Sequence, residues 1–197
     1  MTTIDNSKIY NKYAQDVISG KIIAGEYIKL ACERYLSWFN RDDIYFDYED
    51  VDKKIKFVSL MKHSTGSHAG SNFILLPWQQ FLFAGIFGFK WCDTKYRVVT
   101  KVLAFIARKN GKTATAAALA LAHVMADKEA AAEAEIVANS RQQANIGLVQ
   151  CINFAESIDP KKKYLKPYRS QIKIPKTKSI IQVLSSDSMG NDGYNSS

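Results

Sequence analysis

The sequence predicts an α/β fold in which helices flank a parallel β-sheet, and three observations support this prediction. Residues 98–106 form an apolar run rich in β-branched side chains, which is typical of a buried strand. After a glycine-containing turn, residues 114–126 consist mostly of alanine, leucine and threonine, which favours a helix. Residues 135–140 and 141–156 repeat the order of strand and helix. This alternation is the pattern of a parallel sheet.

The turn between the first strand and its helix has the residues of a phosphate-binding loop. Gly111 lets the backbone approach a phosphate, and the free N–H groups and dipole of a helix start favour an anion. Lys112 would reach the β- and γ-phosphates of ATP, and the Thr113 hydroxyl would ligate Mg²⁺. The general motif has glycine five positions before Gly111, where this chain has Ile106. The alternative is an exposed surface turn with a lysine.

The part of the chain before this loop is predicted to be helical. Amphipathic spacing predicts three helices, over residues 9–19, 24–39 and 48–62. We expect them to form a packed N-terminal element over residues 1–70. A partial P-loop ATPase domain would then occupy residues 71–197. It would start with an aromatic-rich helix over residues 78–89, directly after Pro77.

Three polar residues ahead of the loop have side chains with binding chemistry. Gln79 lies about thirty residues before the loop, and a glutamine amide can pair with N6 and N7 of adenine. Most such residues at helix starts are structural, so this signal is weak alone. His63 and His68 are five residues apart with no cysteine or carboxylate close by in the sequence. We therefore expect loop histidines that hold no metal.

Positive charge is concentrated in the second half of the chain. Residues 1–94 contain as many acidic as basic residues, so the formal excess of +8 lies in residues 95–197. Eight basic residues and no acidic residue occur between 161 and 178. This run fits a footprint for nucleic-acid phosphates and fits a solvated loop and hairpin equally well. The candidate DNA contacts are Lys161, Lys162, Lys163, Lys166 and Arg169.

The end of the chain predicts a hairpin and a loop. Residues 171–174 and 179–184 are two short β-segments around a turn. A working P-loop ATPase also needs a strand that ends in Asp and Glu, which order Mg²⁺ and water. Residues 180–184 are the nearest match, but Gln182 interrupts them and two serines separate them from Asp187. We therefore expect Asp187 in a loop and the chain to stop before its catalytic carboxylates.

Taken in order, the motifs resemble the N-terminal ATPase domain of the terminase large subunits of tailed bacteriophages. These proteins are motors that package DNA into proheads. The resemblance covers almost the whole chain. Its motifs are ACER at 31–34, Lys62-His63, Ala69-Gly70, LPWQ at 76–79, IFG at 86–88, ARKNGKT at 107–113, ANSRQQA at 138–144, SSD at 185–187 and DGYN at 192–195. It implies a RecA-like, ASCE-type P-loop fold.

The resemblance implies a role for each residue of the loop, with ATP and Mg²⁺ as cofactors. Lys112 and Thr113 would hold the phosphates and Mg²⁺, and Arg108 would act in cis on the γ-phosphate. Arg108 and Lys112 would therefore be the catalytic residues. Gln79 would recognise adenine. The full nucleotide-binding set would be Gln79, Arg108, Lys109, Asn110, Gly111, Lys112 and Thr113.

The resemblance also implies partners and a setting. These are double-stranded DNA, the terminase small subunit, the portal or prohead, and further copies of the chain, in the cytoplasm of the bacterial host and away from any membrane. The acidic strand and a nuclease domain would follow residue 197, so we expect a truncated chain with ATPase activity near background. Two other classes remain open. One is a different P-loop enzyme, such as a helicase-like ATPase or a small-molecule kinase, and the other is a non-catalytic module that binds nucleotide, DNA or a partner.

Overall fold

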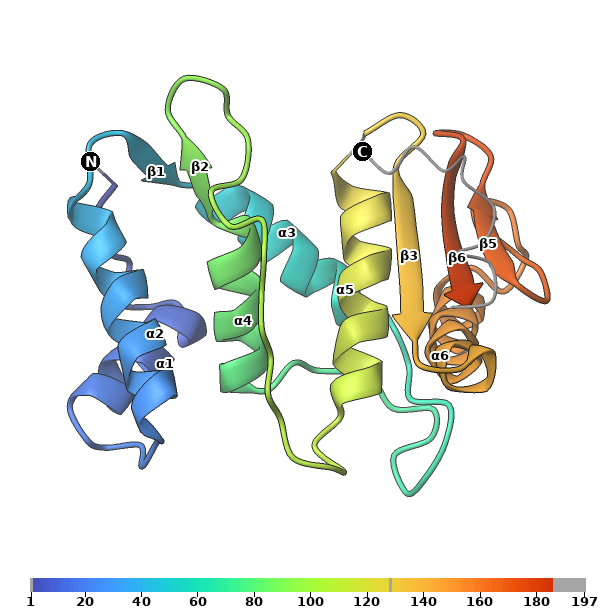
Figure 1. Ribbon diagram of the computed structural model, residues 1–197, viewed down its shortest axis with the longest axis horizontal. Helices are drawn as coiled ribbons and strands as arrows, with labels where there is room; N and C mark the ends of the chain where they lie inside the picture. The colour runs from blue at the N-terminus through green and yellow to red at the C-terminus, as the bar shows by residue number, and fades with distance from the viewer. Residues whose placement is uncertain (1, 128, 186–197) are drawn as a thin grey trace. The chain divides into compact units, whose positions relative to one another are not determined.

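The computed structural model describes residues 2–127 and 129–185, which fall into two compact units (Figure 1). Unit 1 comprises Met1–Lys56 and Ile74–Phe105, and unit 2 comprises Phe57–Phe73 and Ile106–Ser197. Each unit is thus built from two separate stretches of chain. The predicted division into an N-terminal helical element over residues 1–70 and a partial P-loop ATPase domain over residues 71–197 stays a prediction.

Unit 1 is built mainly from helices, as its amphipathic spacing predicts. Its elements are α1 (Ile9–Ile18), α2 (Glu26–Ser37), the 3-10 turn η1 (Trp38–Asn40), β1 (Ile44–Phe46), most of α3 (Tyr48–Val58), α4 (Pro77–Phe87) and β2 (Phe89–Trp91). The four α-helices confirm the predicted ones to within a few residues at each end. Strands β1 and β2 pair antiparallel and were not predicted, because three residues are too few for a visible alternation.

Aromatic rings fill the core of unit 1. The Tyr35 ring meets the rings of Phe39, Phe46 and Phe89 nearly edge-on, with centroids 5.6, 5.9 and 5.2 Å away. Gly88 lies against the same cluster, and a Cβ there would come within 2.2 Å of the Phe46 ring. The C-cap residue of α4 is therefore glycine, because a Cβ at this position would clash with the Phe46 ring of β1.

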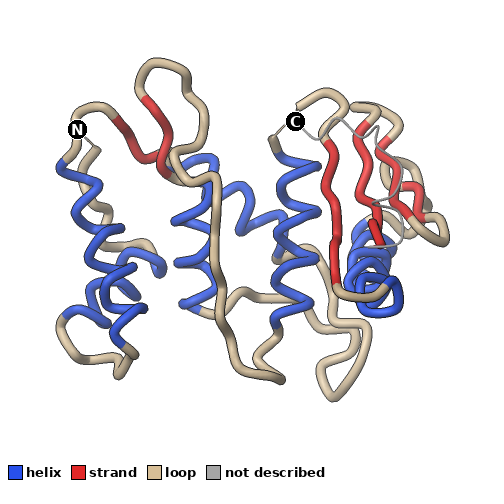
Figure 2. The backbone as a smooth tube through the Cα atoms, in the orientation of Figure 1, coloured by secondary structure: helices blue, strands red, loops and turns tan. Residues whose placement is uncertain are grey.

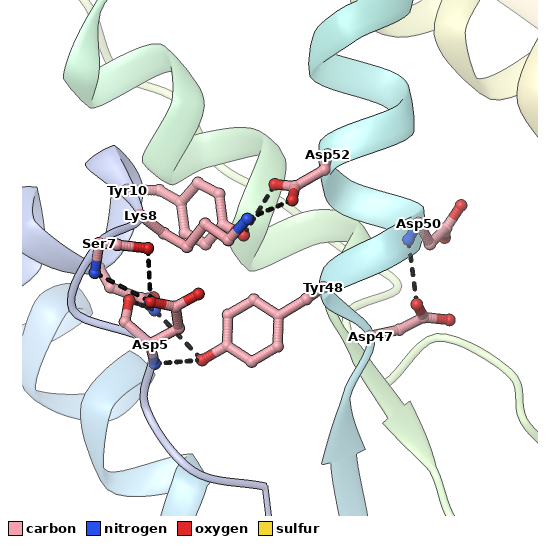
Figure 3. Close-up of polar contacts among 9 residues, drawn as sticks. Asp5, Ser7, Lys8, Tyr10, Asp47, Tyr48, Asp50 and Asp52 are labelled. Carbon is pink, nitrogen blue, oxygen red and sulfur yellow. Dashed lines mark hydrogen bonds and ion pairs between the residues drawn. The ribbon is translucent and has the colours of Figure 1, made fainter.

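Polar contacts fasten the N-terminal segment and α1 to α3 (Figure 3). The Asp5 N–H donates to the Tyr48 hydroxyl at 2.8 Å, and Lys8 Nζ lies 2.5 Å from Asp52 Oδ2. The Tyr10 hydroxyl donates to the other Asp52 oxygen at 3.1 Å. Burial, together with the Asp52 carboxylate, raises the pKa of the Tyr10 phenol. The phenol therefore keeps its proton and this hydrogen bond.

Unit 2 contains a four-stranded mixed sheet with two long helices (Figure 1). Its elements are α5 (Lys112–Ala126), β3 (Glu133–Ala138), α6 (Arg141–Ile158), β4 (Lys166–Pro167), β5 (Gln171–Ile174) and β6 (Ser179–Ser185). The strand order is β3-β6-β5-β4, and only β3 and β6 run parallel. The predicted hairpin of β5 and β6 is confirmed. The predicted parallel pairing occurs between β3 and β6 only, because the short turns that join β4, β5 and β6 can connect only antiparallel strands.

Helix α6 packs on one face of this sheet. Ile172 of β5 and Ile181 of β6 are register partners and are both buried. Gly147 of α6 approaches β3 so closely that a Cβ there would lie 3.0 Å from Ile136 Cγ2. Because side chains alternate along a strand, the neighbours of these isoleucines, such as Lys173, lie on the opposite, more exposed face.

The predicted buried strand over residues 98–106 was wrong. Figure 2 shows the chain ahead of α5 as loop. Val102, Leu103 and Phe105 are 50%, 93% and 99% exposed. A run of high β-propensity becomes a strand only when a neighbour satisfies its N–H and C=O groups. Among the described strands none pairs with this segment. The predicted loop residue Asp187 lies outside the described residues.

Candidate nucleotide-binding site

The loop ahead of α5 leaves the start of that helix accessible. Gly111 is the N-cap residue with φ 71°, in the left-handed region that favours glycine. No side-chain hydrogen bond caps the helix. The Asn110 amide donates instead to the carbonyls of Ala107 and Arg108, at 3.4 and 3.3 Å. Residues 107–113 are all exposed. An anion could therefore reach the first N–H groups of α5.

Helix α5 is held firmly behind this loop. The N–H and hydroxyl of Thr115 both donate to the Gly111 carbonyl, at 2.9 and 3.0 Å. Buried alanines along α5 let α6 approach, and Cys151 Sγ donates to the Ala117 carbonyl at 3.9 Å. Burial raises the pKa of Cys151 to about 12, so the thiol stays protonated. The loop therefore rests on a packed helix pair.

Six of the seven predicted nucleotide-binding residues, Arg108 to Thr113, lie in this loop and at the start of α5, and all six are exposed. The seventh, Gln79, lies in α4 of unit 1 and is 4% exposed. Its side-chain oxygen accepts a hydrogen bond from the Leu76 N–H at 2.7 Å, which caps α4. A capping role explains a buried glutamine at this position, and adenine recognition stays a prediction.

The donors of the loop suit the phosphates of a nucleotide with its magnesium ion. The uncapped N–H groups and the Lys112 ammonium favour negative charge, and the Thr113 hydroxyl is an oxygen ligand of the kind Mg²⁺ takes. The part of the chain that the structure describes contains no cluster of three or more His, Cys, Asp or Glu that could hold a metal. Nor does any helix there have the length and apolar character to span a bilayer.

The predicted DNA-contact segment begins in a loop that Asp159 organises. Its carboxylate accepts N–H bonds from Lys163, Tyr164 and Leu165, at 3.0, 2.6 and 2.8 Å. Burial alone would raise the pKa of Asp159, but these hydrogen bonds outweigh it and hold the pKa below its ordinary value. Lys162 Nζ lies 3.0 Å from a Glu156 carboxylate oxygen. The ionised Asp159 carboxylate therefore orders the start of the basic loop, and Glu156 pairs with one of its lysines.

Removing the Asp159 carboxylate should loosen this loop. We expect Asp159→Ala to lower the free energy of unfolding by about 1–3 kcal/mol, because three N–H groups lose their acceptor. The part of this stability that depends on the charge of the carboxylate is complete above the ordinary Asp pKa of about 3.9 and is lost as pH falls through the lower folded pKa. Urea unfolding at pH 7 and under acidic conditions measures both effects. Amide exchange at residues 163–165 no faster in Asp159→Ala than in the parent would contradict the assignment.

One exposed basic residue beside the candidate DNA contacts was not predicted from the sequence. Lys173 of β5 is the register partner of Lys166 of β4, and both are exposed. The alternation of Lys173 with the buried Ile172 and Ile174 could have placed it outward. Its partner could not have been found, because β4 has only two residues and one is Pro167.

The mixed sheet and its packed helices define an α/β protein in which an uncapped Gly-Lys-Thr turn begins helix α5. The family model described as terminase large subunit, ATPase domain, matches residues 77–197. That range is more than half of the sequence, so the chain belongs to the terminase large subunit family. This confirms the family to which the sequence motifs pointed.

A solved structure shares part of this fold. The large terminase of bacteriophage HK97 matches with a TM-score of 0.56 and 18% sequence identity. The match covers 75% of this chain and 28% of the HK97 chain. At that identity the likeness concerns the fold alone. Because the match covers 28% of the HK97 chain, this chain spans well under half the length of that terminase. No curated protein matches the chain.

Proposed function

We propose that this chain is the nucleotide-binding part of an ATPase that drives the packaging of viral double-stranded DNA. The observation that carries the proposal is the exposed, uncapped start of α5 behind Gly111, within the range matched by the ATPase-domain family. Family membership favours this reading over a helicase-like enzyme or a small-molecule kinase.

Each residue of the loop has a proposed task in binding Mg·ATP. The N–H groups after Gly111 bind a phosphate oxygen, and Lys112 places a point charge on the β- and γ-phosphates. Thr113 ligates Mg²⁺, which neutralises charge that develops on the phosphates. Arg108 stabilises the γ-phosphate in cis, and Lys109 and Asn110 complete the turn. Gln79 would recognise adenine only if its amide leaves the cap of α4.

Titration of the chain with Mg·ATP tests this proposal. We expect saturable binding that weakens by roughly tenfold when EDTA removes the metal, since Thr113 then has no cation through which to hold the phosphates. Isothermal calorimetry measures both affinities. No binding of Mg·ATP up to millimolar nucleotide, by a chain that is folded by circular dichroism, would contradict the proposal.

Double-stranded DNA, the terminase small subunit, the portal and further copies of the chain are the proposed partners in the assembled motor. A packaging motor must hold a duplex without reading its sequence. Lysine contacts to phosphates meet this need, because they give affinity and carry no base information. The proposed DNA contacts are Lys161, Lys162, Lys163, Lys166 and Arg169, all exposed in unit 2.

Replacing Lys161, Lys162 and Lys163 with glutamine should make DNA binding less sensitive to salt. The log–log slope of affinity against salt should become shallower by about 0.9 for each phosphate that the variant no longer neutralises. Fluorescence anisotropy with two unrelated duplexes measures the slope and should show no sequence preference. An unchanged slope in a folded triple variant would mean that these lysines only solvate the loop or face a neighbouring subunit.

A further inference from the structure

The exposed face of the hairpin formed by β4 and β5 carries two lysines directly opposite each other. Lys166 and Lys173 are register partners in the antiparallel ladder, and both are exposed. Such partners have Cβ atoms about 4.5–5.5 Å apart on one face of the sheet, and like charges in this position are destabilising. Within the described residues, neither lysine forms an ion pair.

No acid lies beside this lysine pair on its own row of the sheet. The register places Lys166, Lys173, Ile180 and Glu133 side by side across the four strands. Neighbouring strands are about 4.8 Å apart, so Glu133 lies about 10 Å from Lys173. That distance is about one Debye length at 0.1 M salt. The repulsion within the lysine pair is therefore not neutralised along its row.

Tyr168 lies beside the lysine pair. Lys173 Nζ is 5.8 Å from the centroid of the Tyr168 ring, and the Tyr168 N–H donates to the Gln171 carbonyl at 2.7 Å across the hairpin turn. Because the Lys173 ammonium occupies one face of the Tyr168 ring, the ring is less suited to stacking on an unpaired base. This surface suits the phosphates on the outside of a duplex better than the bases of a single strand.

We propose that Lys166 and Lys173 together bind a backbone phosphate of duplex DNA. The inference rests on the proposed function, which supplies DNA as the partner, and it adds Lys173 and a binding geometry. A phosphate between the two ammonium groups neutralises their repulsion. The pair that lowers the stability of the free protein therefore raises its affinity for DNA.

A matched pair of double variants tests the DNA contact. Lys166→Gln/Lys173→Gln removes the lysine pair, and Lys176→Gln/Lys178→Gln removes the same charge from the turn at the other end of β5. At 0.1 M salt the first variant should bind a fluorescent duplex about eightfold more weakly for each phosphate that it no longer neutralises, with a slope shallower by about 0.9. The second should keep the parent slope. Equal weakening in the two variants, or none in the first, would overturn the proposal.

A second measurement on the same variants tests the repulsion. In low salt, Lys166→Gln/Lys173→Gln should melt about 1–3 °C above the parent, because like charges no longer face each other. The difference should shrink in high salt, where the repulsion is screened. A lower melting temperature than the parent in both low and high salt would overturn the proposal that the lysine pair lowers the stability of the free protein.

Measuring Mg·ATP binding by the same variants shows whether the phosphate that the lysine pair binds belongs to DNA or to a nucleotide. The lysine-pair variant should bind Mg·ATP as the parent does, since Lys112 and Thr113 are unchanged. Loss of ATP affinity with DNA affinity intact would assign the pair to nucleotide phosphates and overturn the DNA assignment. Failure of the parent to bind Mg·ATP, in contrast, would overturn the proposed function. The DNA assignment of the lysine pair would then be decided by the duplex-binding measurements alone.

Discussion

Replacing Lys112 with alanine is expected to reduce the binding of Mg·ATP by about one to two orders of magnitude. Lys112 is the first residue of α5 and is exposed, so its ammonium contributes charge to the site and little to the core. A hydrogen bond to a charged group contributes about 1.5–3 kcal/mol, which corresponds to roughly 10- to 150-fold in affinity. Alanine favours the helix, so the fold should be unchanged.

Calorimetric titration of the parent and Lys112→Ala with Mg·ATP measures this effect. Lys101→Ala is a matched control, because Lys101 is exposed and lies in the loop segment ahead of the turn. The control should bind within about twofold of the parent, as expected for a surface substitution away from the site. Equal affinity in the parent and Lys112→Ala would show that this lysine does not hold the phosphates.

The parts of the site that could be predicted are those determined by local sequence. Gly111 adopts a positive φ, and the alanine-rich segment after it forms α5, because backbone freedom and helix propensity act within a few residues. The hairpin of β5 and β6 was predicted for the same reason. The alternation of apolar residues and the turn at Pro175 lie within one short stretch of chain.

The parts that could not be predicted depend on partners distant in sequence. Residues 98–106 have the composition of a strand, yet no described strand lies beside them to complete one. The capping bond of Gln79 depends on the geometry at Leu76, which the motif alone does not reveal. Lys173 became a candidate DNA-binding residue only when the register placed it opposite Lys166.

A second large effect is expected in unit 1, where Lys54→Ala should lower the free energy of unfolding by about 3–5 kcal/mol. Lys54 is 0% exposed in α3, and its Nζ lies 2.5 Å from Asp50 Oδ1 and 4.6 Å from the Phe87 ring centroid. The substitution removes a buried cation from its carboxylate and leaves a cavity.

A second cation shares the same carboxylate. Lys90 Nζ lies 2.9 Å from Asp50 Oδ2 and 2.8 Å from Asp47 Oδ2. Burial alone would lower the pKa of Lys90, but its hydrogen bonds to both carboxylates outweigh it and raise the pKa. Lys90 therefore stays charged beside Asp50, which places the effect of Lys54→Ala at the lower end of the expected range.

Urea unfolding of three variants separates charge from packing at this position. Lys54→Met keeps most of the side-chain volume and removes only the charge, so it should be more stable than Lys54→Ala by about 1–2 kcal/mol. Lys12→Ala removes an exposed lysine from α1 and should change stability by less than about 0.5 kcal/mol. If Lys54→Met and Lys54→Ala were destabilised by the same amount, the ion pair with Asp50 would account for the whole effect. If neither were destabilised more than the Lys12 control, the buried Lys54 ammonium would not contribute to the stability of unit 1.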